Sequence, residues 1–280
     1  MNHYKKLLLL GILTVIFLHA QSEGEKLSVA TYRTLYSHIL DEERTVVISV
    51  PAGYDYSKQQ YPVLYMLDAE YADFAWSVGL VHYLGAYQMP EMIIVGVLNT
   101  NRNRDMWSYK IEGLANTTDD GAENFMNFFA RELIPFVDQN YRTTSYRVIY
   151  GRSAGGHFVT YCLFAQPDLF DAYLASSPVI GFSNDNLLRQ AEKFFSKHKS
   201  SNRSFFIYYG DTDYNSVVKR IPVLEQIIQE NTPDGFTWGV KRVAGRHGPP
   251  KSLHELLLML FPDWTPVSSP VITPSRAEMV

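Results

Sequence analysis

The sequence contains a single cysteine, Cys162, so an internal disulfide is impossible. Basic residues show no excess: 25 Lys and Arg against 29 Asp and Glu give a formal charge of −4. This balance gives no electrostatic case for binding nucleic acid or an anionic membrane. No repeat period is present. The eight histidines form no H-x-x-x-H or similar pair with a carboxylate, so we expect no metal and no cofactor. Stability must come from the core, where Cys162 is expected as a small buried hydrophobe.

The 280 residues are 46% hydrophobic, enough for one large core and a single domain. One apolar run, from Leu7 to Leu18, follows two lysines and precedes Ala20. It is short for a bilayer span and has the basic and apolar regions of a secretory signal. We therefore predict a signal peptide over 1–20, a domain over 21–264 exported to the periplasm or medium without stable membrane insertion, and a flexible tail over 265–280. Retention of the run as an N-terminal anchor is the alternative.

Apolar runs alternate with amphipathic stretches along the domain. Strands that alternate with helices predict an α/β fold, in which a mainly parallel sheet is covered by helices on both faces. The first two strands suggest an antiparallel start, and residues 106–122 carry little packing signal. Strand patterns occur at 27–36, 45–50, 61–68, 92–98, 146–152, 172–176, 205–209 and 236–243. Helical patterns occur at 75–87, 123–139, a stretch ending near 165, 186–195, 221–229 and 252–261.

The stretch 146–158 passes from a β-rich run through Gly151-Arg152-Ser153-Ala154-Gly155 into a helical pattern. A serine within Gly-x-Ser-x-Gly on such a turn is typical of a nucleophile elbow, in which the hydroxyl projects at the carboxyl edge of a sheet. The glycines are needed where side chains would collide. The alternative is an incidental serine in a Gly-rich turn, and other parts of the chain decide between the two.

Two later loops carry the groups that would activate this serine. Asp211 and Asp213 follow the strand at 205–209, and His247 follows the strand at 236–243. The loops after the carboxyl ends of parallel strands build the site. The order serine, acid, histidine is the order of an α/β-hydrolase fold. We therefore predict Ser153 as the nucleophile, His247 as the base and Asp213 as the acid that orients the imidazole.

Other residues compete for these roles. Asp211 is the alternative acid, but it is close enough to its strand to be a turn former. Asp68 also follows a strand, yet it precedes the serine and breaks the expected order. His157, one turn beyond Ser153, is the rival base, with packing on the helix as its other interpretation. His254 lies inside the last helical pattern and is interpreted as a surface or packing residue.

The oxyanion of a tetrahedral intermediate needs two preorganised N–H donors. Ala154, directly after the serine, supplies one at the start of a helix. The second is expected from the loop after the strand at 61–68, where Ala69 or Glu70 is suitably placed, and Ala69 is preferred. We expect Glu70 to face the substrate.

Several stretches in this order resemble the putative-esterase family, which groups esterase D-like enzymes, feruloyl and acetyl-xylan esterases, and trilactone siderophore esterases. The likeness extends from about Thr31 to Phe261 and is nearest to the siderophore-esterase-like branch. The resembling stretches are 62–68, 90–97, the arginine-containing loop 99–105, 151–156, 166–172, and His247 with 249–253.

The resemblance implies further expectations. In the siderophore-esterase-like branch an arginine after the region 90–98 lies near the substrate, which makes Arg104 the candidate here, with a salt-bridged loop arginine as the alternative. Ala69 stands where a glycine is common. Some members of the branch use a serine–histidine dyad, so the resemblance supports Asp213 less than Ser153 or His247.

These residues together predict an exported serine esterase that forms an acyl-enzyme and acts on a small-molecule or oligosaccharide ester. A siderophore lactone and a feruloyl or acetyl ester of a polysaccharide both fit. An acyltransferase would share every catalytic residue, and a non-catalytic binding module would have lost the nucleophile or base. Four aromatic residues are candidates for the mouth of the site: Tyr71, Trp76, Trp107 and Tyr214.

Overall fold

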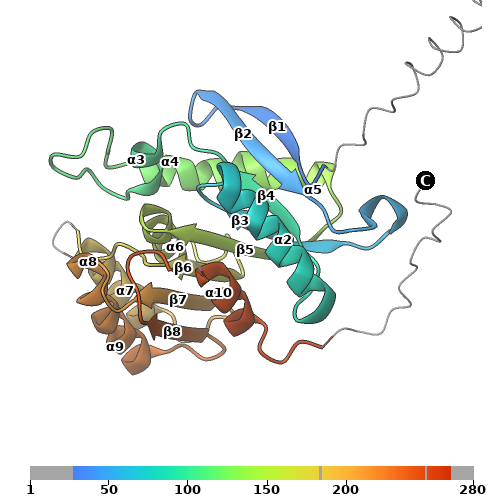
Figure 1. Cartoon of the computed structure of the whole chain (residues 1–280). Helices are drawn as coiled ribbons and strands as arrows, with labels where there is room; N and C mark the ends of the chain where they lie inside the picture. Colours follow the sequence, from blue (N-terminus) through green and yellow to red (C-terminus); the bar gives the residue numbers. More distant parts are fainter. Residues whose placement is uncertain (1–27, 183–184, 250, 266–280) are drawn as a thin grey trace, which may run out of the picture.

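The computed structural model describes residues 28–182, 185–249 and 251–265 (Figure 1). The predicted signal over 1–20 lies outside these ranges, and so does the predicted tail apart from Thr265. Both therefore stay predictions, as do the domain boundaries. Within the described ranges, no helix has both the length and the apolar character that a membrane span requires.

The strands of the described residues form one sheet in the order β1-β2-β4-β3-β5-β6-β7-β8. β1 pairs antiparallel with β2, and β2 pairs antiparallel with β4. Every neighbouring pair from β4 to β8 is parallel, and the carboxyl ends of these strands point to the left in Figure 1. The strands are β1 Thr31–Ser37, β2 Glu42–Ser49, β3 Tyr61–Met66, β4 Ile93–Val97, β5 Thr143–Arg152, β6 Ala172–Ser176, β7 Ser204–Gly210 and β8 Thr237–Val243.

Helices connect the parallel strands and cover the sheet. They are α2 Tyr71–Tyr87, α3 Arg102–Met106, α4 Gly121–Phe128, α5 Ile134–Asn140, α6 Ala154–Ala165, α7 Asn186–Lys197, α8 Asn215–Val218, α9 Ile221–Asn231 and α10 Ser252–Leu260. A 3₁₀ turn, η1, spans Tyr54–Tyr56, and a π-helical turn, η2, spans Phe129–Leu133 between α4 and α5. The predicted helices and strands are confirmed, with ends displaced by a few residues.

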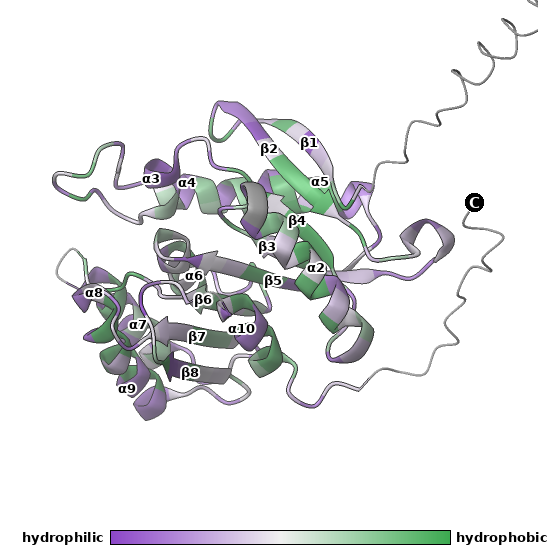
Figure 2. Ribbon diagram, viewed as in Figure 1, coloured by the Kyte–Doolittle hydropathy of each residue, from purple (hydrophilic) through white to green (hydrophobic). Residues whose placement is uncertain are grey.

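Two hydrophobic layers hold the helices to the sheet because alternate residues of a strand point to opposite faces. Val63 and Tyr65 pack in the layer that contains α4, α5, α6, α7 and α9. Leu64 and Met66 face the other layer, against α2 and α10. Figure 2 shows hydrophobic strands at the centre and hydrophilic residues at α3 and the tip of the β1–β2 hairpin. The predicted α/β fold, with helices on both faces of a mainly parallel sheet, is confirmed.

Three short elements, η1, α3 and α8, have no counterpart among the predicted helices. The helix α3 has only five residues, three of them charged, so it has no apolar period. Its position comes from a buried ion-pair network. Arg44 on β2 is fully buried, and its Nη1 lies 2.7 Å from Asp105 Oδ2 and 2.9 Å from Glu42 Oε1. The Arg44 guanidinium also donates to Leu98 O and lies over the Phe125 ring. The network therefore fixes α3 beside the carboxyl edge of the sheet.

Replacing Asp105 by Ala should destabilise the fold strongly, because Arg44 would keep a buried positive charge and lose the carboxylate that lies nearest to it. We expect the free energy of unfolding to fall by about 3 kcal/mol, measured by urea denaturation. Asp168→Ala, which breaks an exposed pair with Arg203, is the control and should cost less than about 1 kcal/mol. Equal losses in the two variants would contradict a stabilising role for the buried network.

Candidate active site

Ser153 lies at the turn between β5 and α6 with φ 61° and ψ −118°. A non-glycine residue in this region is strained and persists only where its surroundings impose the conformation. Here the Ser153 N–H donates to Ser176 O at 2.9 Å, and Ser153 O accepts from His157 N at 2.9 Å. A Cβ on Gly151 would lie 2.4 Å from Gly155 O, so only glycine fits there. The predicted sharp strand-to-helix turn is therefore present.

His247 and Asp213 lie together at the same edge of the sheet. His247 Nδ1 is 2.6 Å from Asp213 Oδ1, and the Asp213 side chain is 0% exposed. The same carboxylate oxygen accepts the Tyr214 N–H at 2.7 Å. His247 Nε2 is buried and has no hydrogen-bond partner among the described residues. An imidazole held through Nδ1–H presents Nε2 as an acceptor, as a general base requires.

Asp211 has a different use. Its N–H donates to Val243 O at 2.8 Å, and its Oδ1 accepts the Gly245 N–H at 3.0 Å. It therefore ties the acid loop to the start of the histidine loop, as a turn former would. Of the two aspartates considered, Asp213 is the one that contacts the imidazole.

The histidine loop approaches the serine turn closely. Gly248, with φ 62°, passes so near Arg152 that a Cβ would lie 2.7 Å from Arg152 Cδ. The Gly248 N–H also donates to Ser177 Oγ at 2.9 Å, directly after the residue that holds the Ser153 N–H. Three loops far apart in the sequence thus meet at one edge, as the sequence predicts for parallel strands.

The N–H groups around the serine correct one expectation. Ala154 is the first residue of α6, where an N–H has no partner within the helix. The Ala69 N–H, in contrast, donates to Val97 O at 3.3 Å, so the prediction of Ala69 as an oxyanion donor is wrong. Glu70 directly precedes α2, and its N–H has no acceptor among the described residues. Glu70 is therefore the better second donor of the two residues considered.

The match to known families agrees with this arrangement. Residues 37–221 match the family model described as "Putative esterase", which is well over half of the chain. The chain belongs to the putative-esterase family.

Relatives and solved structures extend this assignment. The chain is 30% identical over 165 residues to the ferri-bacillibactin esterase BesA of Bacillus subtilis, covering 51% of this chain and 56% of that protein. It is 38% identical over 79 residues to a siderophore enterobactin esterase of Emericella nidulans, covering 27% and 26%. These matches therefore span about half or less of the relatives' lengths. The crystal structure of an IroE-like serine hydrolase from Shewanella oneidensis superposes with a TM-score of 0.77 and 26% identity, covering 85% and 82% of the two chains.

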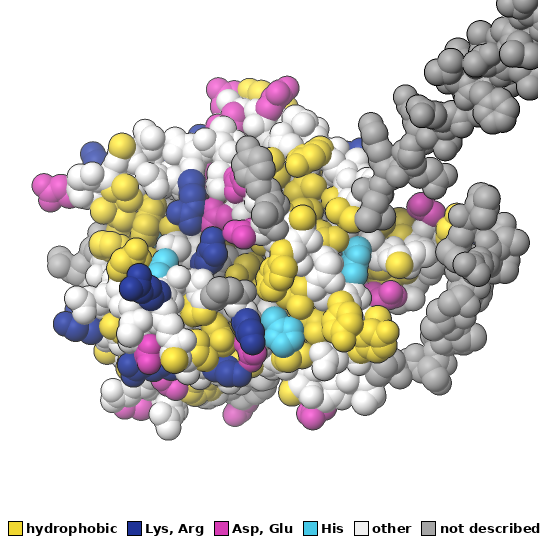
Figure 3. Space-filling model, in the orientation of Figure 1, with side chains coloured by type: hydrophobic (Ala, Val, Ile, Leu, Met, Phe, Trp, Pro, Cys, Tyr) yellow, Lys and Arg dark blue, Asp and Glu magenta, His cyan; other side chains and the backbone are white. Residues whose placement is uncertain are grey.

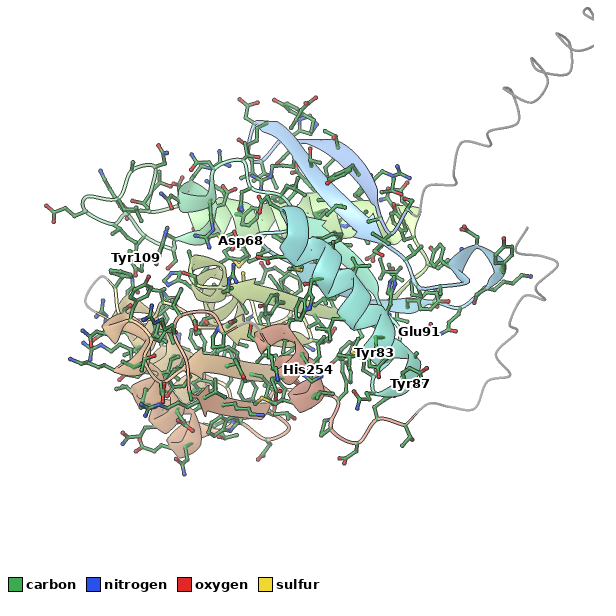
Figure 4. The ribbon with its side chains drawn as sticks, in the orientation of Figure 1. Asp68, Tyr83, Tyr87, Glu91, Tyr109 and His254 are labelled. Carbon is green, nitrogen blue, oxygen red and sulfur yellow. The ribbon has the colours of Figure 1, made fainter. Side chains whose placement is uncertain are left out.

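A polar network holds the loop that follows β3 in this esterase-family chain. Asp68, with φ 55°, receives two hydrogen bonds from Arg102, at 2.6 and 2.8 Å, and one from Asn99 Nδ2 at 2.8 Å. Glu70 accepts from Asn99 N and Nδ2 at 2.6 and 3.1 Å. In Figure 4, Asp68 lies between the start of α2 and α6. The Glu70 carboxylate, predicted to face the substrate, is thus used to join the loops after β3 and β4.

The structure places Arg104, the predicted substrate arginine, in the ion-pair network of α3. Its guanidinium bonds both oxygens of Glu42, at 2.6 and 3.0 Å, and Asp105 at 2.7 Å. The salt-bridged alternative therefore describes Arg104. Arg102 is 37% exposed and reaches to 3.5 Å from Arg152 O at the serine turn. Figure 3 shows separate basic side chains on this face of the molecule, with acidic and hydrophobic side chains among them.

The aromatic candidates separate into two groups. Tyr214 is 64% exposed, and its ring lies 4.7 Å from the His247 ring. Trp107 is buried against His157, and exposed Phe182, which sequence reasoning missed, packs edge-on against Trp107 at 5.5 Å. Trp76 is half exposed on α2. The side chain of Tyr71 lies outside the described part of the structure.

Two further features lie away from the serine turn. His254 is half-buried on α10, with Nδ1 3.5 Å from Glu255, as expected of a surface residue. A polar pocket lined by Asp168, His198 and Arg203 lies at the opposite edge, where the strands begin. In the described ranges no group of three or more His, Cys, Asp or Glu side chains could hold a metal ion.

His157 is a packing residue. It is fully buried, its Nδ1 lies 2.8 Å from Val179 O, and its Nε2 lies 3.0 Å from Ser108 Oγ. Burial lowers its pKa to about 4, so the ring is neutral at pH 7. With both nitrogens engaged, His157 cannot accept a proton from Ser153.

This burial predicts a pH dependence of stability. The unfolded chain protonates His157 near pH 6.5 and the folded chain near pH 4, so the unfolded state binds more protons between these values. The free energy of unfolding should fall as the pH falls through this window, by up to about 3 kcal/mol from His157 alone. Urea denaturation at pH 7 and pH 4.5 should show a smaller loss in His157→Gln than in the unmodified chain. Equal losses would exclude His157 as the source.

Proposed function

We propose that this chain is a serine carboxylic-ester hydrolase in which Ser153, His247 and Asp213 form the catalytic triad. The observation that carries the proposal is the His247 ring: Nδ1 is bonded to a buried carboxylate, and Nε2 is buried with no partner among the described residues. His247 lies in the loop that packs, through Gly248, against the strained serine turn. Family membership supports the same chemistry.

The reaction follows from these groups. Ser153 Oγ attacks the ester carbonyl while His247 Nε2 takes the hydroxyl proton, and the Asp213 carboxylate stabilises the resulting imidazolium. The N–H groups of Ala154 and Glu70 donate to the oxyanion. As the tetrahedral intermediate collapses, the imidazolium protonates the leaving alcohol, which leaves an acyl group on Ser153. Water, deprotonated by His247, then releases the acid and restores the hydroxyl.

For the substrate we propose a siderophore lactone. The two relatives above are named a ferri-bacillibactin esterase and a siderophore enterobactin esterase. Exposed Tyr214 offers an aromatic face beside His247, and Arg102 offers a positive charge beside the serine turn. Such a mouth suits an aromatic acyl group that carries negative charge. A feruloyl or acetyl ester of a polysaccharide is the second candidate, since a ferulate is also a phenolic acyl group.

Two other functions share this fold. An acyltransferase would use the same triad with an alcohol in place of water, so product analysis with an added alcohol separates it from a hydrolase. A binding module would lack a working triad, and all three groups are present here. We also propose export, supported by the signal pattern in residues 1–20, which N-terminal sequencing of the protein from its native cell would test.

Removal of any triad member should abolish ester hydrolysis. Ser153→Ala and His247→Ala should lower kcat for p-nitrophenyl acetate by at least about 10³-fold, and Asp213→Asn by a comparable factor. Asp211→Asn, in the neighbouring turn, is the matched control and should keep kcat within a few-fold. A fluorophosphonate should label the unmodified chain and not Ser153→Ala. Intact activity in Ser153→Ala would mean that the reaction uses another centre.

The two arginines should behave differently. Arg102→Ala should raise KM about tenfold for an iron-loaded catechol trilactone, which is anionic, and much less for neutral p-nitrophenyl acetate. Arg104→Ala should instead lower the melting temperature with little effect on either KM, because its guanidinium bonds Glu42 and Asp105. Equal changes for the two substrates in Arg102→Ala would argue against charge recognition at this position.

A further inference from the structure

The segment 176–179, which consists of the last residue of β6 and the three residues after it, bonds to both the N–H and the C=O of the proposed nucleophile Ser153. Ser176 O accepts the Ser153 N–H at 2.9 Å, and the Val179 N–H lies 3.4 Å from Ser153 O. Val179 O in turn lies 2.8 Å from His157 Nδ1. The serine turn is therefore held through both its N–H and its C=O by the end of β6 and the residues that follow it.

Ser177, in the same segment, takes no part in these hydrogen bonds to Ser153. It bonds instead to the histidine loop, residues 244–249. It is fully buried and has φ 44°, a conformation that a non-glycine residue rarely adopts. Its N–H donates to Tyr208 O at 2.8 Å, which anchors it to β7. Its Oγ accepts the Gly248 N–H at 2.9 Å, one residue from His247.

Among the described residues, the histidine loop (244–249) is otherwise held at its two ends. At the far end, Pro249 O accepts the N–H of Ser252, whose Oγ lies 3.0 Å from Tyr150 OH on β5. Thr212 N and Oγ1 both donate to Gly245 O, at 2.9 and 2.6 Å, and Gly245 N donates to Asp211. These bonds fix the start of the histidine loop, before His247, to the acid loop. Among the hydrogen bonds of the described residues, the bond from Gly248 to Ser177 is the one that joins this loop to the segment 176–179, which holds the serine turn.

We propose that Ser177 is a positioning residue, whose hydroxyl holds the His247 loop in register with the Ser153 turn. The inference rests on the proposed triad and assigns a fourth residue to it. Loss of the hydroxyl would leave the Gly248 N–H without an acceptor and allow the loop, which contains glycines at 245 and 248, to shift relative to Ser153. A shift of about 1 Å in a reacting group can lower a rate by about 10²-fold.

Two substitutions separate positioning from folding. Ser177→Ala removes the acceptor and keeps a Cβ at φ 44°, whereas Ser177→Gly removes the acceptor and relieves the backbone strain. We expect kcat for p-nitrophenyl acetate to fall at least about tenfold in both, with KM within about twofold, because Ser177 does not touch the substrate. The glycine variant should melt at a higher temperature than the alanine variant, although kcat is lowered in both.

Ser49→Ala is the matched control, since Ser49 is also buried on a strand far from the site, where its hydroxyl donates to Val29 O at 2.6 Å and lies 3.4 Å from His82 Nε2. It should leave kcat unchanged. A second readout needs no substrate: the low-field proton resonance of the His247 Nδ1–H, which reports the short bond to Asp213. This resonance should persist in the unmodified chain and in Ser49→Ala, and broaden in both Ser177 variants as the loop becomes mobile.

Unchanged kcat and an unchanged resonance in both Ser177 variants would overturn the inference. A large fall in kcat in Ser177→Ala with none in Ser177→Gly would also overturn the inference. In that case kcat would follow the melting temperature, and the role of Ser177 would be in folding. If the unmodified chain hydrolysed no ester, the proposed function would fail. The resonance would then still decide whether Ser177 holds the His247 loop.

Discussion

The hydrogen bond from the Ser153 N–H to Ser176 O holds the turn on which the rest of the site depends. It forces a serine into a conformation with positive φ at the point where β5 ends and α6 begins. The neighbouring strands β6, β7 and β8 run parallel to β5, so their carboxyl ends bring the acid loop, the histidine loop and the segment after β6 to the same place. The fold thus gathers distant residues, and the local hydrogen bonds set their register.

Two histidines near this turn show how surroundings decide function. His157 is fully buried with both ring nitrogens engaged, so it is neutral and serves to fix Val179 and Ser108. His247 has one nitrogen bonded to a carboxylate and the other without a partner among the described residues. Only the second arrangement leaves a site for a proton to move to and from a nucleophile. Sequence spacing alone places His157 nearer to Ser153, yet the tertiary contacts exclude it as a base.

The sequence predicts the fold, and the loops that meet beside the serine turn, because both depend on local patterns. Buried strands, amphipathic helices and the Gly-x-Ser-x-Gly turn are visible in short windows, and the parallel order then places Asp213 and His247 at one edge. The remaining features depend on contacts between distant residues. Whether Arg102 or Arg104 points to the site depends on Glu42, which lies about 60 residues earlier and bonds Arg104. Ala69 fails as a donor because β4 supplies Val97 O, and Ser177 becomes important only through Gly248.

The central claim is that Ser153 and His247 act as one unit, and a double-mutant cycle tests it most directly. The values to compare are kcat/KM for p-nitrophenyl acetate in Ser153→Ala, His247→Ala and the combined variant. If the two residues share one step, the double variant should be no slower than either single variant, within a few-fold, because the first substitution already removes what the second contributes. Losses that multiply in the double variant would show that the residues act independently and would contradict the proposed triad.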